Sequence, residues 1–68
     1  MFNLKKAVIN GEMSIWCDGE CILGEDSPTE DIETFFEGHD YYLLNERNGV
    51  YDIFENCEFK YLIAKDIK

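Results

Sequence analysis

The stretch EMSIWCDGECILG, residues 12–24, predicts a β-hairpin and with it a fold built mainly from antiparallel strands. Its central Asp-Gly dipeptide suits a two-residue type I′ turn, which needs positive φ at both central positions. In that turn Cys17 lies opposite Glu20. Cys21 then lies opposite Trp16, and successive residues point to opposite faces of the sheet. The two thiols of the CDGEC segment are therefore expected to point apart.

Two Asn-Gly dipeptides repeat the hairpin signal along the chain. Residues 10–11 separate LKKAVI from EMSIWC, and residues 48–49 separate DYYLLNER from VYDIFE. A fourth turn within ENCE, residues 55–58, leads into FKYLIA. Together these signals predict six short strands joined mainly by hairpins.

One helix is expected between the third and fourth strands, over SPTEDIETFFEG, residues 27–38. Ser27 is the expected N-cap, Pro28 the first helical residue and Glu30 the partner in a capping box. Gly38 can end the helix in the left-handed conformation. At about 100° per residue the helix should pack one apolar face on the sheet and turn an acidic stripe to water. The apolar set is Ile32, Phe35 and Phe36, and the acidic set is Glu30, Glu33 and Glu37.

The expected fold class is α+β, mainly β, with the order βββαβββ in a single small acidic domain over residues 1–68. Two arrangements stay open, a small antiparallel sheet covered by the helix and a curled barrel. The second strand is apolar on both faces, which favours a closed or strongly curled sheet. The second half, EGHDYYLLNERNGVYDIFENCEFKYL, residues 37–62, resembles small SH3-like barrels in spacing and alternation, and this resemblance implies the barrel.

The charge of the chain is strongly acidic and unevenly distributed. It has 15 acidic and 6 basic residues, a formal net charge of −9, and no Lys or Arg between Ala7 and Glu46. Such a field repels nucleic acid and anionic membranes, and it accelerates encounter with a basic partner. We therefore expect no direct binding to nucleic acid or membrane. The absence of a signal sequence and the odd number of cysteines predict a cytoplasmic protein with reduced thiols.

Neither a metal site nor an active site is predicted. Cys17, Cys21, His39 and Cys57 have side chains that zinc prefers, but the first two should point apart and the others stand alone. An EF-hand beginning at Asp18 would lack its fifth and twelfth ligands. No Gly-rich phosphate loop or local catalytic signature is present. We expect a non-enzymatic protein that uses no metal or cofactor.

The acidic residues are most concentrated on the helix and its approaches. In size, charge and compactness the chain is similar to small acidic phage proteins that resemble DNA, such as inhibitors of host nucleases and anti-CRISPR proteins. This resemblance implies an inhibitor or immunity-type factor that docks on a basic protein surface, such as that of a nucleic-acid-binding protein. The residues expected to contact the partner are Glu25, Asp26, Glu30, Asp31, Glu33, Glu37 and Asp40.

An alternative hypothesis is an SH3-like structural or interaction module that binds through an apolar groove. Its expected lining residues are Tyr41, Tyr42, Tyr51 and Trp16. The dependence of partner binding on ionic strength would distinguish the two hypotheses, because binding in an apolar groove changes little with ionic strength. Open strand edges would also allow a homodimer.

Overall fold

Two helices and five strands form the fold in the computed structural model, which describes residues 3–39, 41–55 and 58–67. The elements follow the chain in a simple order. They are α1 (Leu4–Ile9), β1 (Met13–Cys17), β2 (Glu20–Leu23), α2 (Thr29–Phe36), β3 (Tyr41–Arg47), β4 (Val50–Glu55) and β5 (Glu58–Asp66).

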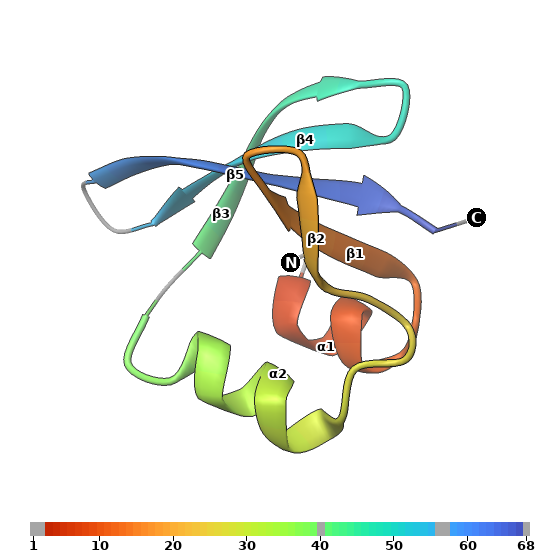
Figure 1. Ribbon diagram of the computed structural model, residues 1–68. Helices are drawn as coiled ribbons and strands as arrows, with labels where there is room; N and C mark the ends of the chain where they lie inside the picture. The colour runs from red at the N-terminus through yellow and green to blue at the C-terminus, as the bar shows by residue number, and fades with distance from the viewer. Residues whose placement is uncertain (1–2, 40, 56–57, 68) are drawn as a thin grey trace.

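The strands form one open antiparallel sheet in the order β2-β1-β5-β4-β3. Both helices lie on the same face of this sheet (Figure 1), and α1 packs against α2, β1 and β3. The expected α+β, mainly β class is confirmed, and so is the antiparallel sheet. The curled barrel is wrong, because β2 and β3 are separate edges of the sheet and do not pair with each other.

The two hairpin turns read from Asp-Gly and Asn-Gly are confirmed. Asp18 and Gly19 have φ of 51° and 80°, and Asn48 and Gly49 have φ of 53° and 83°, as a type I′ turn requires. The register around the first turn is also the expected one, with position 17 facing 20 and position 16 facing 21. Of the fourth turn, residues 56–57 lie outside the described residues.

The first predicted strand, residues 4–9, is wrong: this segment is helix α1. Asn3 caps it, since its Oδ1 accepts a hydrogen bond from the Lys6 amide at 3.0 Å. At the other end the amide of Gly11, which has φ of 76°, donates to the Val8 carbonyl, and the Glu12 amide donates to the Ala7 carbonyl. This is a Schellman ending, which needs the same left-handed residue as a hairpin turn. The order is therefore αββαβββ, with five strands in place of six and two helices in place of one.

The expected start of α2 is also wrong, by one residue. The helix begins at Thr29 with Pro28 at the N-cap, and no side chain caps it. The capping box expected between Glu30 and the Ser27 amide does not form, because the Ser27 amide donates to the Gly24 carbonyl at 3.1 Å. Ser27 accepts a hydrogen bond from the Gly24 amide instead, at 2.9 Å.

The core lies between the helices and the inner face of the sheet. Ile15, Ala64 and Tyr51 are neighbours across three strands on this face, and the first two are fully buried. Helix α2 contributes Ile32 and Phe36, which are 2% and 9% exposed. This layer accounts for the apolar positions that alternate along β1 and β4.

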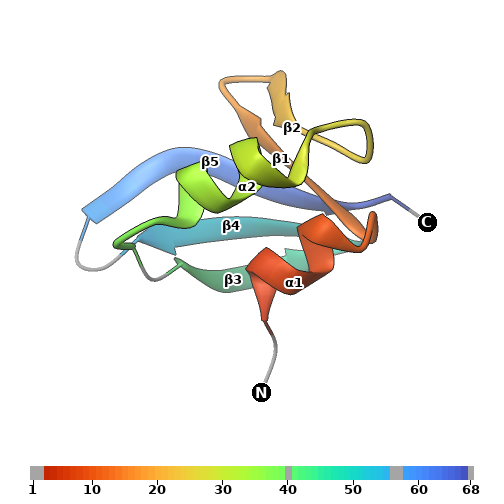
Figure 2. The same cartoon turned by 90° about the horizontal axis from the view of Figure 1, so that it is seen from below.

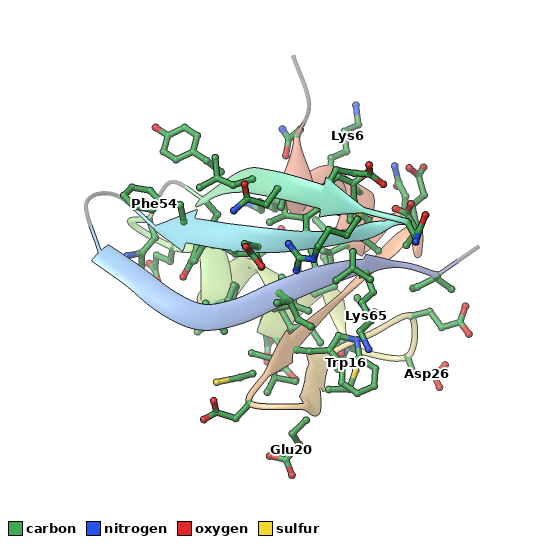
Figure 3. The ribbon with its side chains drawn as sticks, turned by 90° about the horizontal axis from the view of Figure 1, so that it is seen from above. Lys6, Trp16, Glu20, Asp26, Phe54 and Lys65 are labelled. Carbon is green, nitrogen blue, oxygen red and sulfur yellow. The ribbon has the colours of Figure 1, made fainter. Side chains whose placement is uncertain are left out.

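The outer face of the sheet also carries apolar side chains, although neither described helix covers it. The Trp16 indole donates to the Ser14 hydroxyl at 2.9 Å, and the Lys65 ammonium lies 4.2 Å from the centre of the Trp16 ring. Figure 3 shows Trp16 and Lys65 together on this face. A long lysine side chain can shield apolar surface while its charged end stays in water. Two-sided apolar strands therefore fit an open sheet here.

Candidate partner-binding surfaces

Six of the seven acidic residues predicted for partner binding lie in the described part of the chain. We call them the acidic surface. Each of the six is exposed, and they follow one another from the loop after β2 to the end of α2. The seventh, Asp40, lies outside the described residues. The acidic surface consists of Glu25, Asp26, Glu30, Asp31, Glu33 and Glu37.

A tight turn fixes the first two members of the acidic surface. The Ser27 amide donates to the Gly24 carbonyl at 3.1 Å, and the Gly24 amide donates to the Ser27 hydroxyl at 2.9 Å. These two bonds close a four-residue turn in which Glu25 and Asp26 occupy the central positions. Figure 3 shows Asp26 projecting outward from this loop. The turn therefore directs both carboxylates toward solvent.

Helix α2 carries three of the other four members, and the fourth, Glu37, is its C-cap residue. Ile32 and Phe36 are buried against the sheet, so the helix has one defined orientation. Phe35 stacks on Tyr41 with ring centres 5.0 Å apart, which anchors the last turn to β3. The glutamates lie on the side turned away from these contacts, and the acidic stripe expected on the helix is exposed as predicted.

The positive charges of the described residues do not neutralise this surface. Arg47 forms an ion pair with Asp52, with Nη2 and Oδ1 2.9 Å apart, on the β3–β4 hairpin. Hydrogen bonding to Asp52 raises the pKa of Arg47, and the same bond lowers the pKa of Asp52. Lys65 lies over Trp16 on the outer face. Within the described part of the chain, no carboxylate of the acidic surface has a basic group at ion-pair distance.

The second candidate surface is a groove of about 890 Å³ on the helix side of β3. Tyr41 closes one side of it, donating its hydroxyl to the Phe35 carbonyl at 3.3 Å. Tyr51 lines the groove from β4, and its pKa is raised mainly by burial and further by the carboxylates of Asp66 and Glu46. The lining residues come from α1, α2, β3 and β4 and include Leu4, Lys5, Phe36, Tyr41, Leu43 and Tyr51.

The groove brings together three of the four aromatic residues expected to form it. Tyr41, Tyr42 and Tyr51 line it, but Trp16 lies on the outer face of the sheet. The contribution of α1 was missed, because residues 4–9 were expected to be a strand. A signal was present: the buried positions Leu4, Ala7 and Val8 follow the i, i+3, i+4 spacing of a helix.

The cysteines at the first hairpin point apart, as the turn predicted. Cys17 is half-buried on the helix side, whereas Cys21 is exposed and donates its thiol to the Leu23 carbonyl at 3.4 Å. Among residues 3–39, 41–55 and 58–67, no three Cys, His, Asp or Glu side chains are grouped so as to hold a metal ion. Cys57 lies outside the described residues.

Comparisons with protein-family models, with curated proteins and with solved structures find no match for this chain. As for membranes, neither described helix has the length and apolar character needed to span a bilayer.

Proposed function

We propose that this protein is a non-enzymatic acidic binding factor, an inhibitor or immunity-type protein that docks the acidic surface on a basic protein. The observation that carries the proposal is the run of six exposed carboxylates, from Glu25 to Glu37, that no described basic group neutralises. A net charge of −9 on 68 residues extends this field around the molecule. Such a field steers a basic partner toward the surface before contact.

The scaffold supports this function because it holds the carboxylates in place. The Gly24–Ser27 turn and the packing of α2 fix their positions before a partner arrives. A preorganised surface loses less conformational entropy on binding than a mobile acidic tail. A fixed row of negative charges is also what the Lys and Arg side chains of a nucleic-acid-binding protein accept from a phosphate backbone. A mimic of nucleic acid is the form of the proposal that we favour.

The experiment compares two triple variants that remove the same charge. Glu30→Gln, Glu33→Gln and Glu37→Gln together remove three carboxylates from the acidic surface. The control, Glu12→Gln, Asp18→Asn and Glu20→Gln, removes three exposed carboxylates outside it. Asn is accepted at position 18, because Asn-Gly also suits the type I′ turn there.

The partner is first captured from lysate at low salt, eluted at high salt and identified. Its association with each variant is then followed by surface plasmon resonance. The helix variant should associate roughly tenfold more slowly than wild type at low salt, with a smaller effect in the control and convergence of the rates at high salt. Equal association rates for the two triple variants would show that the acidic surface does not guide association with the partner.

The groove beside β3 supports a second candidate function, an interaction module that binds an apolar segment of a partner. The observation in its favour is that Tyr41, Tyr42 and Tyr51 line one groove of about 890 Å³ together with Leu43. Binding there should change little with ionic strength and should fall when Leu43→Ser removes an apolar side chain that lines the groove. Capture that resists high-salt elution would favour this function over the first.

A further inference from the structure

β3 is an open edge of the sheet. Among the described strands its only neighbour is β4, so the backbone N–H and C=O groups of alternate residues point away from the sheet. The opposite edge, β2, has four residues, whereas β3 has seven. Long edge strands are templates for pairing with another strand, and proteins often protect them with charge, proline or a covering segment.

The first part of β3 has none of the usual side-chain protection. Residues 41–45, YYLLN, contain no charge and no proline. Tyr42 is 55% exposed and Leu44 is 41% exposed, and these are two of the four large exposed hydrophobic residues in the described part of the chain. Their partners on β4 are Phe54 and Asp52, which places both on the outer face of the sheet. Figure 3 looks onto this face and labels Phe54.

We propose that β3 pairs with β3 of a second copy of this chain, forming a two-fold dimer with one continuous antiparallel sheet. In such a dimer, residues that lie opposite each other must point to the same face of the sheet. The two-fold axis must therefore pass through a residue and not between two residues, because a one-residue shift in register would pair side chains from opposite faces. An axis at Leu43 sets Tyr42 of each copy opposite Leu44 of the other, so the dimer contains two Tyr–Leu pairs. Aromatic and aliphatic side chains in such directly opposed positions stabilise a strand pair.

The same register places the two Leu43 side chains face to face on the helix side. Leu43 lines the groove beside β3 in each copy, so the two grooves would meet at the axis. Asn45 limits the pairing, since it has φ of 53° at the irregular end of β3. The paired segment is thus short and uncharged, and the same residues supply both sides of the contact.

Charge favours this edge as the meeting point of two acidic chains. Figure 2 shows α2, which carries three of the six residues of the acidic surface, under β1 and β5, with α1 on the side of β3. Helix α1 presents Lys5 and Lys6, both exposed, at this side of the molecule. A second copy at β3 therefore meets lysines, apolar residues and the single carboxylate of Glu46 before it meets α2. The remaining repulsion between two chains of charge −9 should be screened by salt.

The test is analytical ultracentrifugation of the purified protein without a partner, at roughly 0.1 M and 1 M salt. The wild type should show a monomer–dimer equilibrium whose dimer fraction rises with salt. Leu44→Lys should weaken the dimer by about tenfold or more, because it replaces the leucine of both Tyr–Leu pairs with a charged side chain. Tyr42→Lys should act in the same way.

Ile22→Lys is the matched control. Ile22 is also 41% exposed and lies on the other edge strand, and the change in net charge is the same. It should leave the dimer unchanged, and circular dichroism checks that each variant is folded. A wild type that stays monomeric at both salt concentrations, or an equal effect of Ile22→Lys and Leu44→Lys, would overturn the proposal. Salt should strengthen this dimer but weaken binding to a basic partner. The measurements can therefore contradict either proposal without contradicting the other.

Discussion

Two glycines in equivalent turns allow a prediction in which backbone strain and steric contact are separated. Gly19 and Gly49 are both second residues of type I′ turns, with φ of 80° and 83°. A methyl group added at Gly19 meets no atom within 4 Å. At Gly49 it would lie 3.0 Å from Oδ2 and 3.4 Å from Cβ of Asp66. Both alanine variants therefore have the cost of placing a side chain at positive φ, and only Gly49→Ala also has the cost of the contact with Asp66.

The magnitudes follow from these distances. Alanine at positive φ should cost each variant about 1–2 kcal/mol of the free energy of unfolding. Gly49→Ala must also displace the Asp66 side chain. The Asp66 amide donates to the Gly49 carbonyl at 2.8 Å, which holds its backbone close. Forcing that side chain from its preferred rotamer should add about 0.5–1.5 kcal/mol.

Urea unfolding of the two variants measures the difference directly. Gly49→Ala should be less stable than Gly19→Ala by about 1 kcal/mol. The pKa of Tyr51 supplies a second measurement, because the Asp66 carboxylate is one cause of its upward shift. An NMR titration should give a lower Tyr51 pKa in Gly49→Ala than in Gly19→Ala if Asp66 moves away. Equal stabilities and equal Tyr51 titrations would refute the reasoning.

Three further predictions concern other contacts. Asp52 has a pKa below its ordinary value, chiefly because Arg47 donates a hydrogen bond to it. The pair therefore stabilises the fold at pH values above the unfolded-state pKa of Asp52, and this stabilisation is lost as the pH falls through the folded-state pKa. Arg47→Met should lower the urea midpoint at neutral pH, with a difference from wild type that disappears in acid. Asn3→Ala should cost about 1 kcal/mol in urea unfolding by removing the cap of α1, Asn3→Asp should retain the cap, and a neutral alanine variant would contradict that role. Ile53→Ala, at a side chain that is 0% exposed, should cost about 2–5 kcal/mol in thermal or urea unfolding, and a loss below 1 kcal/mol would contradict its place in the core.

Local turn chemistry made part of this fold predictable. The dipeptides at 18–19 and 48–49 need positive φ at two successive residues, and few alternatives to a type I′ hairpin satisfy both. The dipeptide at 10–11 carries the same letters, yet only Gly11 has positive φ, and it ends a helix. The distinction lies in the six residues before it. Their buried positions are three and four residues apart, which a period-two interpretation of so short a segment did not detect.

Closure of the sheet could not be decided from alternation alone. Apolar residues on both strand faces fit a barrel, but they also fit an open sheet whose outer face is shielded by Lys65 over Trp16. That contact joins strands separated by most of the chain, and no local pattern encodes it. The exposure of the acidic surface was predictable, because charged residues opposite a buried helix face must be in water. The groove was predicted only in part, since it depends on where α1 packs.

The position of β5 has a consequence for how the chain acquires its structure during synthesis. β5 follows the other four strands in the sequence but lies between β1 and β4 in the sheet. The β1–β2 and β3–β4 hairpins can each form as soon as their residues leave the ribosome, but no strand pairs with both of them until β5 emerges. Until then both β1 and β4 expose the edges that β5 will occupy. Ribosomal pausing before residue 58 would therefore leave a nascent chain whose two hairpins are not yet joined in one sheet, with two unpaired inner edges available for misassociation.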